Sequence, residues 1–189
     1  MRFGDESFSN NTRSTIGVDY KARAVTMRNG EVVKLQIWDT AGQERFRAMT
    51  KSFFARSKAI ILTFDVSNLE SFEALHGTEG WLSSIRSSVA DDTAIVLCAN
   101  KADLPETSWA VKRVVIKEFA DENSLRVHEV SALSGQGVKE MFLDVAEMIL
   151  ANLKSAKSAS SRETVSVNDS VRITFSDQLN AVPKKGCSC

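Results

Sequence analysis

The stretch 94–103, AIVLCANKAD, decides the fold class of this chain. Its first six residues form an uninterrupted apolar run that is too short to span a membrane and is typical of a strand buried on both faces. A similar run, AIIL, stands at 59–62, and helical patterns follow the two runs at about 69–87 and 107–122. The repetition of strand and helix predicts an α/β fold with a mostly parallel sheet flanked by helices.

Two further regions complete this pattern. Alternating runs at 18–27 and 32–38 flank an Asn-Gly dipeptide at 29–30, whose two positions tolerate positive φ, so a β-hairpin is predicted. Another strand is expected at 126–130. The segment 138–153 repeats apolar residues at a spacing of three and four, which predicts a helix that faces the core.

The composition changes after residue 153 to small and polar residues without sustained periodicity. We therefore expect one domain at 1–153 and a flexible tail at 154–189. The run VRITF at 171–175 has strand-like residues, but an isolated short run between polar segments is more typical of an unstructured segment or a transient docking motif.

The bulk properties exclude several classes of function. Lys+Arg and Asp+Glu balance at 24 each, so no overall field indicates nucleic acid as a partner. The first residues, MRFGDE, contain no apolar segment of a signal peptide. Three cysteines are too few for a disulfide framework and favour a reducing compartment.

Polar residues that suit phosphate chemistry follow the predicted strand at 32–38. Asp39 stands at the end of this strand, where a carboxylate can hold Mg²⁺ directly or through water. Gly42 offers a backbone N–H that a terminal phosphate can approach without a side chain in the way, and Gln43 could orient an attacking water. An Asp-x-x-Gly pattern alone is common in turns.

A second polar loop, NKAD at 100–103, follows the strand within 94–99. The Asp103 carboxylate could accept two hydrogen bonds from the N1 and N2 edge of guanine, an edge that adenine does not offer. The alternative interpretation is an ordinary Asn turn with a solvated Asp before Pro105. A third loop, SAL at 131–133, is weak evidence alone, and its value comes from the order of the three loops at the ends of successive strands.

Taken together, these stretches resemble a small GTPase of the Ras superfamily and, more narrowly, a Rab protein. The resemblance is carried by STIGVDYK at 14–21, KLQIW at 34–38, WDTAGQERF at 38–46 and the loops at 100–103 and 131–133. It extends over about 1–153, and residues 154–189 then correspond to the variable tail of the family.

The resemblance implies a GTPase that converts GTP to GDP and phosphate, with Mg²⁺ as its metal. It implies Gln43 as the catalytic residue and Thr15 and Asp39 as metal ligands. The implied GTP-binding residues are Thr15, Asp39, Gly42, Asn100, Lys101, Asp103, Ser131, Ala132 and Leu133. Leu133 stands where the family usually has Lys, while Tyr20, Phe53 and Phe54 replace other aromatic residues.

The phosphate loop of such proteins, G-x-x-x-x-G-K-[ST], occurs nowhere in the 189 residues. The family also places its first strand between the strand that ends at Trp38 and the strand at 59–64. We therefore expect an open slot at that position, marginal stability and weak grip on the nucleotide phosphates.

The chain ends in Cys187-Ser188-Cys189, which resembles the doubly geranylgeranylated terminus of Rab proteins. This resemblance implies a protein on the cytoplasmic face of an intracellular membrane that cycles with the cytosol. The implied partners are a Rab escort protein, GDP-dissociation inhibitor, exchange and activating proteins, and effectors. Two alternatives remain open at this point, namely an interaction module that works without nucleotide and a non-functional remnant.

Overall fold

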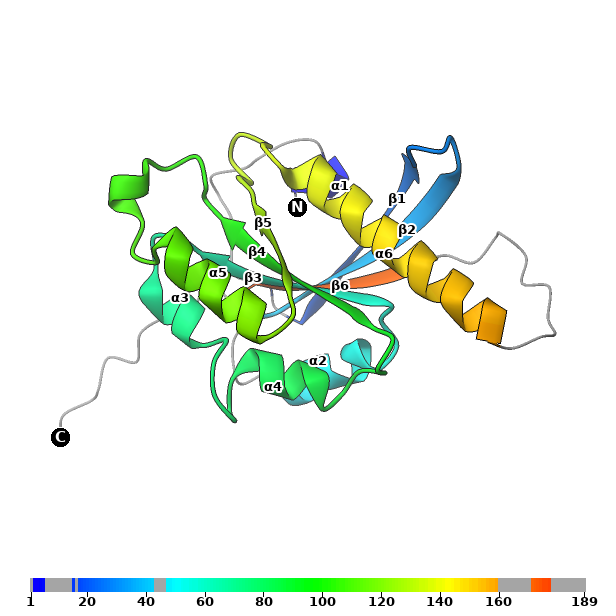
Figure 1. Cartoon of the computed structure of the whole chain (residues 1–189), viewed down its shortest axis with the longest axis horizontal. Helices are drawn as coiled ribbons and strands as arrows, with labels where there is room; N and C mark the ends of the chain where they lie inside the picture. Colours follow the sequence, from blue (N-terminus) through cyan, green and yellow to red (C-terminus); the bar gives the residue numbers. More distant parts are fainter. Residues whose placement is uncertain (1, 6–14, 16, 43–46, 160–170, 178–189) are drawn as a thin grey trace.

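The computed structural model describes residues 2–5, 15, 17–42, 47–159 and 171–177. Within these residues a six-stranded sheet has the order β1-β2-β6-β3-β4-β5, and helices cover both of its faces (Figure 1). β1 is antiparallel to β2, and the remaining neighbouring strands are parallel. The predicted α/β class with a mostly parallel sheet is confirmed.

The predicted hairpin consists of β1 (Val18–Thr26) and β2 (Val32–Thr40). The Gly30 N–H donates to the Met27 carbonyl at 3.0 Å and closes the turn. Gly30 has φ 82, whereas Asn29 keeps a negative φ, so only one of the two positions uses the conformation expected of both. The turn therefore needs the conformational freedom of glycine at one position, and a side chain at Gly30 would strain the backbone there.

The parallel part of the sheet contains β3 (Ala59–Asp65), β4 (Ala94–Asn100) and β5 (Arg126–Glu129). Every residue of β3 is buried, as expected for a central strand with helices on both faces. This arrangement explains why its sequence is continuously apolar where β2 alternates.

The main difference from the sequence-based expectation is β6 (Val171–Asp177). It lies between β2 and β3 and runs parallel to both, visible as the orange strand in Figure 1. The prediction that 171–175 is unstructured is therefore wrong, and the slot expected between these strands is filled. The reason is that β6 obtains backbone partners on both sides from strands far away in sequence, which no local window displays.

The described helices are α1 (Arg2–Asp5), α2 (Arg47–Phe54), α3 (Leu69–Glu73), α4 (Trp81–Arg86), a short 3-10 helix (Glu106–Ser108), α5 (Arg113–Glu122) and α6 (Val138–Ala159). The single helix predicted at 69–87 is interrupted, because Gly77 has φ 76 and a Cβ atom on Gly80 would lie 2.0 Å from the His76 carbonyl oxygen. α6 continues to Ala159, into the segment that was predicted to be a flexible tail.

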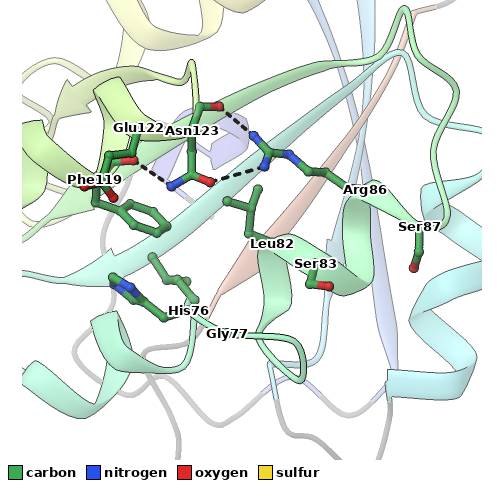
Figure 2. A pocket seen from close by; sticks show the side chains of 10 residues that line it. His76, Gly77, Leu82, Ser83, Arg86, Ser87, Phe119, Glu122 and Asn123 are labelled. Carbon is green, nitrogen blue, oxygen red and sulfur yellow. Dashed lines mark hydrogen bonds between the residues drawn. The ribbon is translucent and has the colours of Figure 1, made fainter.

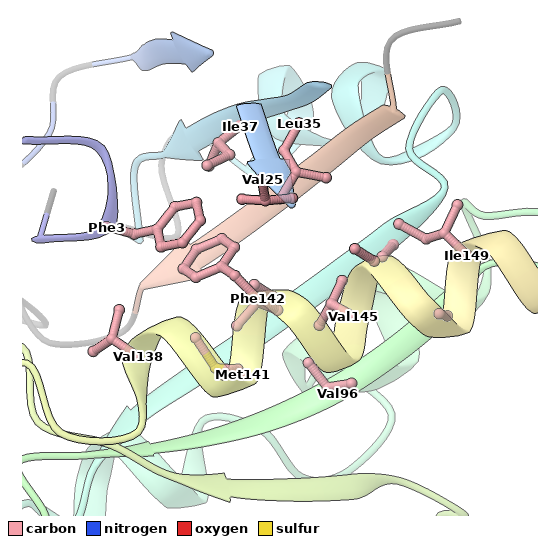
Figure 3. Packing of buried hydrophobic residues seen from close by; sticks show 14 of the residues in the cluster. Phe3, Val25, Leu35, Ile37, Val96, Val138, Met141, Phe142, Val145 and Ile149 are labelled. Atoms are coloured by element: carbon pink, nitrogen blue, oxygen red, sulfur yellow. The ribbon is translucent and has the colours of Figure 1, made fainter. Parts of the chain in front are cut away.

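Two apolar clusters lie on opposite faces of the sheet. One contains α6, Phe3 of α1 and residues of β1 and β2, and the other packs α3, α4 and α5 against β3 and β4. In the first cluster the rings of Phe3 and Phe142 stack, with centroids 3.9 Å apart and planes at 13° (Figure 3). This stack packs α1 against α6, in the cluster that also contains apolar residues of the β1-β2 hairpin.

Candidate functional site

The candidate site lies at the carboxyl edge of the parallel strands. The register places Asp65 at the end of β3 beside Asn100 at the end of β4. On the other side of β6, Thr40 at the end of β2 is aligned with Ser176. This edge is where ligands of open α/β sheets bind, and the loops that follow β2, β3, β4 and β5 all start there.

Asn100 connects the loops that follow β4 and β5. Its side chain is buried, and its Oδ1 accepts a hydrogen bond of 3.1 Å from the Ala132 N–H. The Ala102 N–H donates to the Val130 carbonyl at 2.9 Å. Two sequence motifs, 100–103 and 131–133, are therefore held against each other by one side-chain bond and one backbone bond.

Lys101 forms an ion pair with the end of β3. Its Nζ lies 2.6 Å from Oδ2 of Asp65, a carboxylate of which only 6% is exposed. The other oxygen of Asp65 accepts hydrogen bonds from the N–H and the hydroxyl of Ser67, at 2.9 and 2.7 Å. Lys101 has φ 66, a backbone conformation that ordinary side chains rarely adopt, so the loop is held in an unusual shape by its surroundings.

The remaining residues of the two motifs divide into buried and exposed positions. Ser131 is fully buried, and its hydroxyl accepts a hydrogen bond of 3.0 Å from the Ser134 N–H. Asp103 and Leu133 are exposed, and Leu133 has 55% of its surface accessible. The Asp103 carboxylate is thus open to a ligand, while Ser131 shapes its loop from inside.

Asp39, near the end of β2, has a different environment. Burial raises the pKa of the Asp39 carboxyl to about 6, and the nearby Asp19 carboxylate adds to the rise. Asp19 is its register partner on β1. A carboxylate in this position is destabilised as an anion, and a bound cation would reverse that effect.

The other predicted residues on this side are only partly covered by the structure. Gly42 and Thr15 are half-buried, and the Ala41 N–H donates to the Gly17 carbonyl at 2.9 Å, which joins the segments that bear them. The predicted catalytic residue Gln43 and the predicted lipidation residues Cys187 and Cys189 lie outside the described residues.

Sequence reasoning missed Asp65 and Ser67. A signal was present, because Asp65 directly follows the apolar run at 59–64 in the same way that Asn100 follows its own strand. Its role could not be derived, since the partner Lys101 is adjacent only after β3 and β4 have paired.

A hollow lies elsewhere, between the α3–α4 connection and the end of α5 (Figure 2). Its volume is about 590 Å³, and Arg86 donates to the side chain and the carbonyl of Asn123 at 3.2 and 2.6 Å. The ring of His76 packs on Phe119 with centroids 4.3 Å apart, and desolvation lowers the pKa of this histidine. None of the sequence-predicted site residues lines the hollow.

The helices in the described part of the chain include none that is long and apolar enough to cross a membrane.

Comparison with known proteins gives consistent matches over nearly the whole chain. The sequence model of the Ras family matches residues 1–151. The Ras-related protein Rab-4 of Dictyostelium discoideum is 39% identical over 193 aligned positions, which include 100% of this chain and 88% of the relative.

Two further relatives show similar agreement. The GTP-binding protein YPT1 of Saccharomyces cerevisiae is 43% identical over 149 positions, with 79% of this chain and 70% of the relative aligned. The Ras-related protein Rab-4A of Bos taurus is 37% identical over 156 positions, with 82% of this chain and 69% of the relative aligned.

Proposed function

Because this chain belongs to the Rab-type small GTPases of the Ras superfamily, we propose that it is a guanine-nucleotide switch of vesicle traffic that hydrolyses GTP to GDP and phosphate. One observation carries the proposal. The Asn100 side chain holds the Ala132 N–H at 3.1 Å, so the two predicted base-binding loops form one unit at the carboxyl edge of the sheet.

In this proposal the base is read by three groups of that unit. The exposed Asp103 carboxylate accepts hydrogen bonds from N1 and N2 of guanine. The Ala132 N–H, which donates to Asn100 Oδ1 in this structure, would turn toward the base oxygen when nucleotide binds, and the Lys101 stem would lie beside the ring. The ion pair with Asp65 supports the last role, because it restrains a side chain that would otherwise be free to rotate.

The phosphate end would be formed by Asp39, Gly42 and Thr15, with Gln43 orienting the water. A raised pKa supports Asp39 as a cation ligand, since a bound Mg²⁺ stabilises the charged carboxylate. A Mg²⁺ ion held here would keep several water molecules and phosphate oxygens among its ligands. When bound, Mg²⁺ neutralises charge on the phosphate oxygens.

Membrane attachment is the second part of the proposal. Cys187 and Cys189 would carry geranylgeranyl groups, and two lipid chains give stable anchoring where one gives only reversible binding. The protein would then work on the cytoplasmic face of an intracellular membrane. Its partners would be a Rab escort protein, GDP-dissociation inhibitor, exchange and activating proteins, and effectors.

The test is a titration of the full chain with fluorescent GDP in the presence of Mg²⁺, with ADP as the competing base. We expect GDP to bind in preference to ADP and Asp103→Ala to weaken GDP binding about 10- to 100-fold, the value of one or two charged hydrogen bonds. The matched control is Asp91→Ala, another exposed Asp that lies before β4, at the opposite edge of the sheet. It should bind GDP like the unaltered chain.

Hydrolysis is measured separately as phosphate release from GTP. Gln43→Ala should slow this release while leaving GDP affinity unchanged, because Gln43 is proposed to act on water rather than on the base. If the full chain shows no preference for GDP over ADP, the proposal is wrong and the interaction module without nucleotide becomes the better hypothesis.

A further inference from the structure

The centre of the sheet depends on the last strand in the sequence. β2 and β3 do not pair with each other in the described structure; each pairs with β6 on one side. On their other sides β2 pairs with β1 and β3 pairs with β4. In the described sheet, β1-β2 and β3-β4-β5 are therefore two parts that each keep internal pairing, and the backbone hydrogen bonds that link them run through β6.

The backbone groups along this gap restrict what can fill it. β6 is aligned with β2 from Leu35 to Thr40 and with β3 from Ala59 to Thr63. Without an occupant, one row of N–H and C=O groups on each strand would lose its partners. A helix or an apolar ligand cannot supply such partners, whereas an extended peptide running parallel to both strands can.

The residues on either side of the gap define the side-chain pattern of a suitable occupant. Leu35 and Ile37 are fully buried on the sheet face that α6 covers (Figure 3). Ile61 of β3 is fully buried in the same cluster. The backbone register aligns position 171 with Leu35, position 173 with Ile37 and position 175 with Ile61. The sequence VRITFSD has an apolar residue at each of these alternate positions. The pattern that fits is a strand with apolar residues at every second position.

We propose that the gap between β2 and β3 is a strand-acceptor site whose ligand is an extended, alternately apolar peptide, and that Val171–Asp177 of the same chain is its exchangeable occupant. β6 is the last described element, and each of its two neighbours keeps another partner, so its departure leaves β1-β2 and β3-β4-β5 internally paired. The carboxyl end of the occupant lies at the same edge of the sheet as Asp39. The residues that come after the occupant in its own sequence therefore start near Asp39. This inference does not depend on nucleotide binding and extends beyond the proposed function.

The first test is cross-linking within the full chain, in a Cys187→Ser/Cys189→Ser background. Gln36 and Arg172 are register partners, and neighbouring strands are about 4.8 Å apart, within the range of a disulfide. Gln36→Cys/Arg172→Cys should form an intramolecular disulfide on mild oxidation. The shifted pair Gln36→Cys/Ile173→Cys, whose positions face opposite sides of the sheet, should form at least tenfold less. Equal yields in both pairs, or a link between two chains, would overturn the proposal.

The second test adds the ligand itself. A labelled peptide with the sequence of residues 169–178 is titrated into full chain that carries Ile173→Pro, a change that removes a backbone donor from the chain's own strand. We expect the peptide to bind, and its own Ile173→Pro version to bind at least tenfold more weakly. The oxidised Gln36–Arg172 chain, with its slot locked, should not bind the peptide.

Hydrogen exchange of β2 and β3 amides makes this test independent of how well the Ile173→Pro chain folds. Added peptide should restore slow exchange at 35–40 and 59–63, whether the variant starts folded or unfolded. Failure of the peptide to restore protection, or equal binding to the locked chain, would show that the gap is not an acceptor site.

Discussion

The two ends of the candidate site are stabilised in different ways. At the end formed by β3, β4 and β5, polar groups are paired within the protein: Asn100 with the Ala132 N–H, and Lys101 with Asp65. At the end formed by β2, the Asp39 carboxyl is buried enough to have a pKa of about 6 and lies near a second carboxylate, Asp19. One end is internally satisfied, and the other favours an added cation.

This difference follows from the strands behind each end. β3 and β4 pair directly with each other and are buried along nearly their whole length, so their loops have fixed starting points. Within the described sheet the hairpin of β1 and β2 is joined to them through β6, and its apolar side chains share a cluster with α6. The loops after β4 and β5 therefore start from strands that pair directly with each other, while the loop after β2 starts from a strand joined to that part of the sheet through β6.

The largest effect is expected where the hairpin is attached to the rest of the fold. Phe142→Ala removes a fully buried ring that stacks on Phe3 and should lower the free energy of unfolding by about 3–5 kcal/mol. Urea unfolding measures this loss. Leu143→Ala, the next residue on α6 and only partly buried, is the control and should cost clearly less. A loss below about 1 kcal/mol for Phe142→Ala would show that the stack does not hold the two parts together.

The second effect concerns the charge on Asp39. Since its folded pKa is raised to about 6, the folded state binds this proton more tightly than the unfolded chain does, and stability should fall as pH rises from about 4 to 6. Asp39→Asn should remove this fall and gain about 2 kcal/mol at pH 7 after partial solvent screening.

Chemical denaturation at a series of pH values checks the Asp39 prediction. Asp19→Asn serves as the comparison variant, because removing the neighbouring charge should shift the fall toward lower pH without abolishing it. An unchanged pH dependence in Asp39→Asn would assign the effect to another group.

The third effect tests the hydrogen bond between the loops that follow β4 and β5. Asn100→Ala removes the acceptor of the Ala132 N–H and should cost about 1–3 kcal/mol, because a partly buried donor loses its partner. Hydrogen exchange should speed up at the Ala132 amide. The Ser134 amide, which donates to Ser131 Oγ, is the internal reference and should keep its rate. If both amides change alike, the loop as a whole has moved and the specific pairing is not supported.

The smallest effect is expected at the tip of the hairpin. In Gly30→Ala the new Cβ meets no atom within 4 Å, but the residue keeps φ 82. The free energy of unfolding should therefore fall only by the cost of this backbone conformation, about 1 kcal/mol. Gly137→Ala is the contrasting variant, because its φ is 69 and the new Cβ would lie 2.6 Å from the Glu129 carbonyl oxygen at the end of β5. Thermal unfolding should show the larger loss for Gly137→Ala, and the reverse order would contradict the rigid character of the β5 end.

Much of the fold was predictable because its signals are local. Continuous apolar runs identified β3 and β4, alternation identified the β1-β2 hairpin, and a helical stripe identified α6. Breaks that depend on a few residues were harder to predict. The interruption between α3 and α4 is set by Gly77 and Gly80, and the strand-like pattern at 171–175 was judged without the partners that make it β6.

The candidate site divides in the same way. The loops after β2, β4 and β5 could be selected from sequence, because residues that follow buried strands come to one edge of a parallel sheet. Asp65 could not be selected, since its part in the site is an ion pair with Lys101, which follows a different strand. Gln43, Cys187 and Cys189 lie outside the described residues, and their roles stay predictions.

By itself the sequence determined the alternation of strands and helices from β1 to α6 in outline, the parallel sheet and the positions of the polar loops, because these follow from periodicity and burial preference within short windows. Only the tertiary structure decided that Val171–Asp177 forms the centre of the sheet, that Asn100 holds Ala132, and that the pKa of Asp39 rises to about 6. Each of these depends on backbone partners or desolvation supplied by residues distant in sequence, and those become neighbours only when the chain is folded.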